Sequence, residues 1–296
     1  MATRQSGGWS GESSAERALY RNKVCIVTDS ASDILPRHAQ ALGIVVVPNR
    51  VVMDGRSLRD GIDITASEFY ARLPRTRAAP YTEPASAKDL YSTYQAVFNL
   101  GATAIISAHV SSRLSQLVNH AQAVRDYLAP APIYVLDTQQ AGIGMWPAVT
   151  WGARLANRGA SAQDIYARMV STLAHTRLYF LVESLEYLRR GGRVGRIQEF
   201  LGTLLDAHPI LTIEQGEVRP VESVRPRARA ARRMRELALA RQGIDTLLLC
   251  GTSIEAIAQM ENLLSEQYNG LIQKTWLGPT LGANTGPAVA IAVVAP

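Results

Sequence analysis

The sequence predicts an α/β protein of two domains: an N-terminal domain of βαβ units on a parallel sheet, and a C-terminal α+β domain with a mixed sheet. Three observations support this prediction. The chain has 296 residues, enough for two separate cores. Up to residue 175, apolar runs of strand length alternate with helical stretches, which is typical of parallel sheets. Beyond residue 175 strand-like runs predominate, and a turn at residues 214–217 joins two of them as a hairpin.

We expect three segments along the chain. Residues 1–22 are polar, rich in Gly and Ser, and lack the apolar stretch of a signal peptide, so they predict a flexible tail. Residues 23–175 form the α/β domain, and residues 176–296 form the α+β domain. Cys25 and Cys250 each lie in an apolar run, as core thiols of a cytoplasmic protein do. No apolar run has the length of a membrane span.

Local signals place the elements of the first domain. Pro36 suits the first turn of a helix that ends at Gly43, and Thr65 with Glu68 has the form of a capping box. Strands are expected at residues 24–28, 44–47, 104–107 and 133–136. Helices are expected at residues 35–43, 69–73, 86–98, 114–128, 143–158 and 162–175.

The second domain is expected to be richer in strands. A helix at residues 183–190 follows its first strand. The strands are expected at residues 179–182, 210–214, 218–225, 246–250, 271–277 and 288–294. Since a hairpin joins two of these strands, the sheet is mixed or antiparallel.

Polar side chains follow several strands of the predicted parallel sheet. Ligands of such sheets bind beyond the carboxyl ends of the strands, and hydroxyls beside free backbone N–H groups attract anions there. Any one of these residues alone is more often a helix cap. Because the strand ends meet in one crevice, we expect a ligand site there. Its candidate residues are Asp29, Ser30, Ser111 and Ser112, with Thr82 from the loop at residues 80–84.

Arg193 is a further candidate at this site. It follows Gly191 and Gly192, which allow the backbone to approach a ligand closely. A guanidinium pairs with an anion through two parallel hydrogen bonds. We therefore expect Arg193 near an anionic group of the ligand.

The sequence favours a binding protein over an enzyme. Ser111, His109 and Asp29 are the residue types of a catalytic triad, but no Gly-x-Ser-x-Gly elbow accompanies them. The two Cys and five His do not cluster with zinc spacing, so we expect no metal and no cofactor. The alternative is an enzyme that acts on a small anionic substrate in the same interdomain cleft, with Asp29 or a serine as the reactive group.

The net charge of +6 is partly concentrated in eight arginines between Arg219 and Arg241. A helix in this segment would present a basic face and pack through Met234. The arginines of that face are Arg225, Arg229, Arg232 and Arg233. A solvated helix face is the ordinary interpretation, and docking of an acidic protein is the alternative. Nucleic acid is not favoured, because neither an aromatic platform nor a helix-turn-helix accompanies the arginines.

Together these motifs resemble the DegV family. The resemblance extends from residue 23 to the C-terminus and depends on four segments in a fixed order. These are Val-Thr-Asp-Ser-Ala-Ser-Asp at residues 27–33, Leu-Arg-Arg-Gly-Gly-Arg-Val at 188–194, residues 204–211, and the closing motif at 278–287.

The resemblance implies a protein that binds a long-chain fatty acid. It implies an acyl chain in a hydrophobic tunnel of the first domain, with the second domain closing over the carboxylate. On this sequence the implied carboxylate contacts are Ser111 and Thr82, with Arg193 nearby. It also implies a partner, a separate fatty-acid kinase to which the carboxylate is presented.

Several positions depart from the family's pattern at the head-group end. The family usually has Thr-Ser-x-Pro-Ser where this chain has residues 81–85, and Ser-Gly-Thr where it has Ser111, Ser112 and Arg113. The histidine of the closing motif is Asn284, which forms hydrogen bonds but cannot carry a proton. These departures leave the scaffold unchanged.

Overall fold

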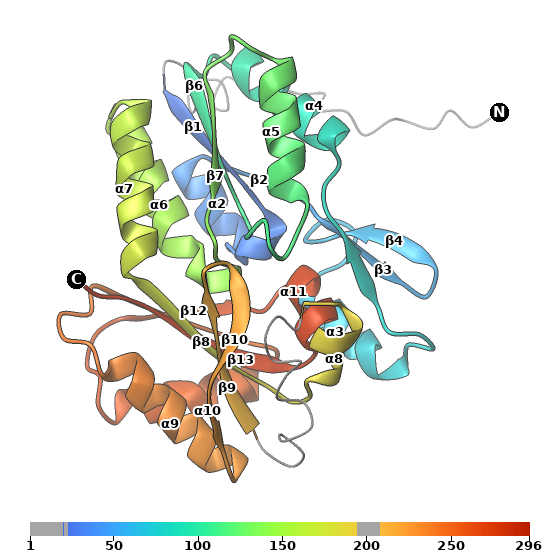
Figure 1. Cartoon of the computed structure of the whole chain (residues 1–296), viewed down its shortest axis with the longest axis vertical. Coiled ribbons are helices and arrows are strands. Elements are labelled where there is room, and N and C mark those ends of the chain that lie inside the picture. Colours follow the sequence, from blue (N-terminus) through green and yellow to red (C-terminus); the bar gives the residue numbers. More distant parts are fainter. Residues whose placement is uncertain (1–19, 21–22, 194–207) are drawn as a thin grey trace.

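A computed structural model describes Tyr20, residues 23–193 and residues 208–296. It confirms the predicted α/β fold, with a parallel sheet in the N-terminal half and a mixed sheet in the C-terminal half (Figure 1). Apart from Tyr20, the predicted tail at residues 1–22 lies outside the described residues. The same holds for residues 194–207, which include part of the motifs between residues 188 and 211.

The N-terminal sheet has the strand order β2-β1-β6-β7, and every neighbouring pair is parallel. Its strands are β1 (Val24–Asp29), β2 (Ile44–Val47), β6 (Ala104–His109) and β7 (Ile133–Asp137). The chain continues from β1 to β2 on one side, whereas β6 and β7 lie on the other side. The order therefore reverses between β1 and β6, and such a switch point is where open α/β sheets bind ligands.

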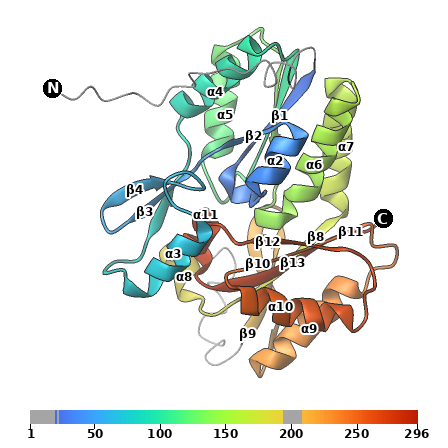
Figure 2. The same ribbon diagram turned by 180° about the vertical axis from the view of Figure 1, so that it is seen from behind.

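Helices cover both faces of this sheet (Figures 1 and 2), which explains why most of its strand residues are apolar. Ile26 of β1 packs on one side, and Cys25 and Val27 pack on the other. The helices of the first side are α2 (Pro36–Leu42), α6 (Trp146–Asn157) and α7 (Ala162–His175). Those of the second side are α4 (Ala87–Asn99) and α5 (Leu117–Tyr127).

Helix ends follow the local signals closely. The helix α2 begins at Pro36 and ends at Gly43, whose φ of 68° is left-handed. The predicted capping box of Thr65 and Glu68 is present, so α3 (Ala66–Arg72) begins earlier than residue 69. The helices α5 and α6 begin later than predicted, because residues 111–115 form a turn and Gly142–Gly144 is a 3-10 helix.

The structure also contains a three-stranded antiparallel sheet that the sequence patterns did not predict. Its order is β4-β3-β5, formed by β3 (Arg50–Met53), β4 (Arg56–Arg59) and β5 (Tyr81–Glu83). Asp54 and Gly55, both at positive φ, form the turn between β3 and β4, and this Asp-Gly pair was an available hairpin signal. The strand β5 has only three residues. This sheet packs against α3 and places Thr82 beside the centre of the molecule.

The C-terminal sheet has the order β10-β9-β8-β13-β11-β12. Only β11 and β12 are parallel, so the predicted mixed sheet is confirmed, and the predicted hairpin joins β9 to β10. Its strands are β8 (Thr176–Val182), β9 (His208–Glu214), β10 (Glu217–Val224), β11 (Thr246–Gly251), β12 (Ile272–Trp276) and β13 (Ala288–Val294). Its helices are α8 (Glu186–Arg190), α9 (Arg227–Leu239), α10 (Ile254–Ser265) and α11 (Pro279–Thr285).

The helices α9 and α10 cover one face of this sheet, and the other face turns toward the N-terminal half (Figure 2). Met234 of α9 is buried against the sheet, as predicted for the basic helix. Arg233 Nε lies 2.7 Å from Glu222 Oε1, which partly neutralises the basic face. Docking of an acidic protein on this basic face stays a prediction. Of the helices in the described ranges, none combines the length and the apolarity that crossing a membrane requires.

Substitution of Phe69 tests whether the small antiparallel sheet unfolds together with the rest of the protein. Its side chain is fully buried in a cluster with Val51, Met53 and Ala283 of α11. We expect Phe69→Ala to lower the free energy of unfolding by about 3–5 kcal/mol in urea titrations. The control is Ile62→Ala, because Ile62 is 59% exposed and its truncation should cost less than about 0.5 kcal/mol. Equal effects of the two changes would show that the cluster unfolds separately.

Candidate ligand-binding cavity

A cavity lies between the two large sheets, at the switch point of the parallel sheet. Ala31, which follows β1, lines it together with Val110 and Leu114, which follow β6. About 110 Å³ of this cavity is open to the centres of water-sized molecules. We expected the acyl pocket within residues 23–175, but the cavity takes its lining from both halves of the chain.

The wall formed by the mixed sheet is apolar. It consists of Leu178, Phe180, Ile213, Val218, Cys250, Ala288 and Ala290 from the strands, and of Leu277, which directly follows β12. In β13, alanines alternate with larger residues, so Ala288 and Ala290 face the cavity while Val289 and Ile291 pack toward α9 and α10. The small inward side chains leave space at the centre of the sheet, and this alternation opens the cavity.

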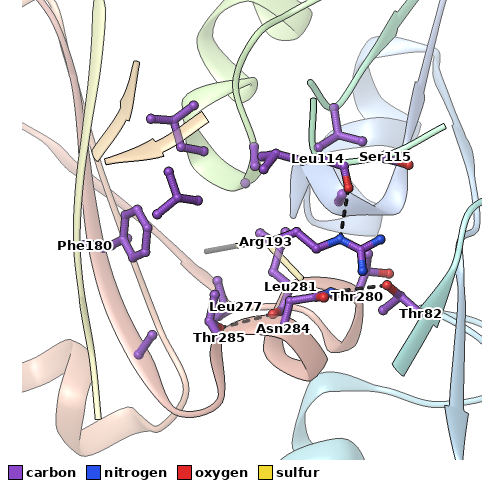
Figure 3. Close-up of a pocket in the computed structure, with 18 of the residues that line it drawn as sticks. Thr82, Leu114, Ser115, Phe180, Arg193, Leu277, Thr280, Leu281, Asn284 and Thr285 are labelled. Carbon is purple, nitrogen blue, oxygen red and sulfur yellow. Dashed lines mark hydrogen bonds between the residues drawn. The ribbon is translucent and has the colours of Figure 1, made fainter. Parts of the chain in front are cut away.

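Polar groups gather at one end of the cavity, on the side away from Phe180 (Figure 3). Asn284 of α11 donates from Nδ2 to Thr82 Oγ1 at 3.2 Å. Arg193 donates from Nε to the carbonyl of Leu114 at 3.2 Å and from Nη1 to the carbonyl of Gly191. Ser115 lines the same end, and its Oγ accepts the N–H of Leu117 at 3.3 Å. This end therefore offers a guanidinium, two hydroxyls and an amide.

The two glycines before Arg193 have separate roles. Gly192 has a φ of +70°, a conformation that other residues rarely adopt. A side chain at Gly191 would come within 2.6 Å of Asn284 Oδ1. The pair therefore turns the chain after α8 and allows it to approach α11 closely, which brings Arg193 to the polar end.

The structure divides the predicted site residues into two groups. Thr82, Arg193 and Asn284 line the cavity together. Ser111 and Ser112 do not: Ser111 Oγ donates to the carbonyl of Gly216 at 2.8 Å, and Ser112 Oγ donates to Asp137 Oδ2 at 2.5 Å. Ser111 thus links the two halves of the chain instead of facing the cavity.

Ser115 is the serine that sequence reasoning missed. Its N–H donates to the carbonyl of Ser111 at 3.0 Å, so one turn of backbone separates the two hydroxyls. The segment 111–115 contains three serines of equal chemical character. Only the path of this turn decides which hydroxyl reaches the cavity.

Asp29 and Ser30 support the cavity without lining it. Asp29 is fully buried and accepts the N–H of Ala31 at 3.0 Å, the N–H of Val110 at 3.1 Å and Nδ2 of Asn49 at 3.0 Å. Ser30 Oγ accepts the N–H of Asn49 at 3.0 Å. Asp29 therefore connects the ends of β1 and β6 and has no solvent-accessible surface.

Two further carboxylates contact the N-terminal end of α11. Asp60 Oδ2 accepts both the N–H of Thr280, at 3.1 Å, and its hydroxyl, at 2.5 Å. Asp33 Oδ1 accepts the N–H of Gly278 at 3.0 Å. Burial raises the pKa of Asp60 to about 6, and burial together with the charge of Asp60 raises the pKa of Asp33 well above its usual range. We call Asp33 and Asp60, with these contacts to Gly278 and Thr280, the α11 clamp.

Comparison with known proteins agrees with this architecture. The chain matches the family model described as "Uncharacterised protein, DegV family" over residues 23–296. This chain belongs to the DegV family. A DegV domain-containing protein of Streptomyces coelicolor is 31% identical over 277 residues, which cover 92% of this chain and 98% of the relative. Another, from Caldanaerobacter subterraneus, is 35% identical over 210 residues, or 71% of this chain and 74% of the relative.

Solved DegV structures have the same fold. A DegV family protein from Thermus thermophilus, described for its fatty acid binding, superposes with a TM-score of 0.84 at 29% identity, covering 93% of this chain and 100% of that one. DegV from Bacillus subtilis, described as a fatty acid binding protein, also has a TM-score of 0.84, at 25% identity, with coverage of 93% and 99%.

A triad-like arrangement is present in this DegV chain, but it is buried. His109 Nδ1 lies 3.0 Å from Asp29 Oδ2, and its Nε2 lies 2.7 Å from Ser107 Oγ, not from Ser111. Tyr94 donates to the same Ser107 oxygen at 2.7 Å. All four side chains are inaccessible, and none lines the cavity. Within the described ranges, no group of three or more His, Cys, Asp or Glu side chains is placed to hold a metal ion.

Asp60 should make the stability of the fold depend on pH. A carboxyl whose pKa rises from 3.8 to about 6 on folding contributes stability below pH 3.8 that is lost as the pH rises through 6. The full effect is about 3 kcal/mol. We therefore expect the wild type to lose stability relative to Asp60→Asn as the pH rises from 5 to 8. Urea titrations of both proteins at both pH values measure the free energies of unfolding.

Asp63→Asn is the matched control for this measurement. Asp63 is in the same segment, but its pairing with Arg59 lowers its pKa to about 2, so its charge does not change between pH 5 and 8. If the free energy of unfolding had the same pH dependence in the wild type and in Asp60→Asn, the raised pKa of the buried Asp60 would be contradicted.

Proposed function

We propose that this chain binds a long-chain fatty acid, with the acyl chain along the apolar wall of the cavity and the carboxylate at its polar end. The proposal rests on one observation: a single cavity combines an apolar lining with a guanidinium and hydroxyls at one end. The fatty acid binding described for the relatives from Thermus thermophilus and Bacillus subtilis supports the proposal. In this proposal residues 23–175 and 176–296 are two domains that enclose the ligand between them.

Burial of the acyl chain would supply most of the affinity. Each buried methylene contributes about 0.8 kcal/mol, so roughly ten of them contribute about 8 kcal/mol before the entropic cost of association. The wall offers few polar groups that would have to be desolvated. An apolar chain of this length is therefore expected to remain bound through purification.

The polar end would hold the carboxylate through charge-assisted hydrogen bonds. Because Asn284 donates to Thr82 Oγ1, the hydroxyl hydrogen of Thr82 is available for the ligand. Ser115 accepts a backbone N–H and can likewise donate its hydroxyl hydrogen. Arg193 is held at this end by two carbonyls and brings the positive charge. A charged acceptor strengthens each such bond about twofold.

We further propose that the chain is a carrier that performs no chemistry itself and presents the carboxylate to a fatty-acid kinase. Glu83, which is exposed, lines the cavity beside Thr82, so the polar end is close to the protein surface. Asp29 and the Ser107–His109 pair, the groups an enzyme would use, are buried away from the cavity. A carboxylate at the polar end would be accessible to a partner protein.

Organic extraction of the purified protein followed by mass spectrometry tests the ligand. We expect about one fatty acid per chain. Ala290→Phe is designed to fill the cavity from the centre of the sheet and should abolish the bound lipid while the protein stays folded. A wild-type protein that contains no lipid and refuses added oleate would refute the proposal.

Substitutions at the polar end test the carboxylate contacts. Thr82→Val, Ser115→Ala and Arg193→Gln should each weaken oleate binding in titration calorimetry by about 10- to 100-fold, because a hydrogen bond to a charged group contributes about 1.5–3 kcal/mol. Ser111→Ala is the matched control: its hydroxyl binds Gly216, so the affinity should change by less than about threefold. A larger loss for Ser111→Ala than for Ser115→Ala would reverse the assignment.

A further inference from the structure

The helix α11 connects the polar end of the cavity to the opposite half of the chain. Its residues Leu281, Asn284 and Thr285 line the cavity. Its N-terminal end is held by the α11 clamp and by Ser30, whose Oγ lies 3.2 Å from Thr280 Oγ1. Figure 1 shows α11 beside α3, at the junction of the two halves. The position of Asn284 therefore depends on contacts made at the other end of its helix.

Every contact of the clamp joins residues from different halves of the chain. Asp33 and Asp60 precede residue 175, whereas Gly278 and Thr280 follow it. Thr275 adds a similar contact, since its Oγ1 donates to the carbonyl of Asp33 at 3.0 Å. The cavity is lined from both halves, and these contacts hold the halves together beside it, at the helix that carries Leu281 and Asn284.

We propose that Asp60 is a positioning residue that holds α11 closed over the ligand, and that protonation of Asp60 strengthens this closure, so that fatty-acid exchange slows in acid. This inference rests on the proposed fatty-acid binding and concerns the regulation of the same cavity.

The groups around Asp60 explain the direction of the effect. The carboxylates that face it are Asp29, at the end of β1, and Asp33; Tyr70 of α3 and Cys250 of β11 lie beside Asp33. The helix α11, residues 279–285, carries no titratable side chain. Burial, and then the charge of Asp29, raise the pKa of Asp60 to about 6 in the closed state.

Separation of α11 would expose Asp60 to water and return its pKa to its ordinary value of 3.8. The closed state thus binds the proton more tightly than the open state, and acid favours closure. With these two pKa values, opening becomes about tenfold more favourable between pH 5 and pH 8. Asp33, whose pKa burial also raises, acts in the same direction.

Asp60→Asn is the informative substitution. Both donors of Thr280 reach the same oxygen, Oδ2, so an amide oxygen at this place can accept both while carrying no charge. The protein is loaded with cis-parinaric acid, a fluorescent fatty acid, and chased with excess oleate at pH 5 and pH 8. We expect release about tenfold faster at pH 8 for the wild type and for the control Asp63→Asn. The Asp60→Asn variant should release slowly at both values.

A second measurement is independent of the ligand. Hydrogen exchange of the Thr280 amide in ligand-free protein, corrected for the intrinsic pH dependence, should show about tenfold greater protection at pH 5 than at pH 8 in the wild type and no such difference in Asp60→Asn. If Asp60→Asn does not fold, Thr280→Val serves instead: it removes the hydroxyl donor and should speed release at both pH values.

The outcomes separate the two proposals. The role of Asp60 would be overturned if the release rate and the protection of the Thr280 amide responded to pH equally in the wild type and in Asp60→Asn. The proposed fatty-acid binding would then stand. Unchanged release in Thr280→Val would overturn it as well. Failure of every variant to take up cis-parinaric acid, with pH-dependent protection of Thr280 retained, would instead overturn the proposed ligand and leave the clamp supported.

Discussion

The arrangement of this protein depends on one buried carboxylate, Asp29. Burying an unpaired charge is very costly, so the chain has to bring donors to it. Three of those donors belong to Ala31, Asn49 and Val110, and these residues also line the cavity. The requirement to satisfy Asp29 therefore determines where the ends of β1 and β6 lie, and with them one side of the cavity. His109 completes the set from within β6.

The second constraint is the division of the cavity into an apolar wall and a polar end. The wall is the inward face of a sheet whose other face packs on two helices. The polar end consists of residues from three separate segments, around Thr82, Ser115 and Arg193, together with α11. Burial against an apolar wall is not directional, whereas hydrogen bonds at a polar end are directional. The same helix that carries Asn284 is held at its beginning by Asp33 and Asp60, so the geometry of the site and the contact between the two halves are coupled.

Sequence patterns predicted the two large sheets and most of their helices, because burial on both faces of a parallel sheet and caps such as Thr65 leave strong local signals. The small sheet of β3, β4 and β5 was missed, since strands of three or four residues have little periodicity. At the site, Thr82, Arg193 and Asn284 were predicted and do lie together. Ser115 and not the predicted Ser111 lines the cavity, and the sequence could not show this because hydroxyls one turn apart cannot be distinguished without the path of the backbone.

The sequence by itself determined the fold class, the order of the elements, the family and the presence of polar groups at the strand ends, because these follow from periodicity and from short motifs. Only the tertiary structure decided that Asp29 is fully buried and does not line the cavity, that Ser107 and not Ser111 bonds to His109, and that Asp60 contacts α11 across 220 positions of sequence. Burial and partnership between distant residues are properties of the packed chain. They decide whether a polar side chain meets a ligand or supports the backbone around it.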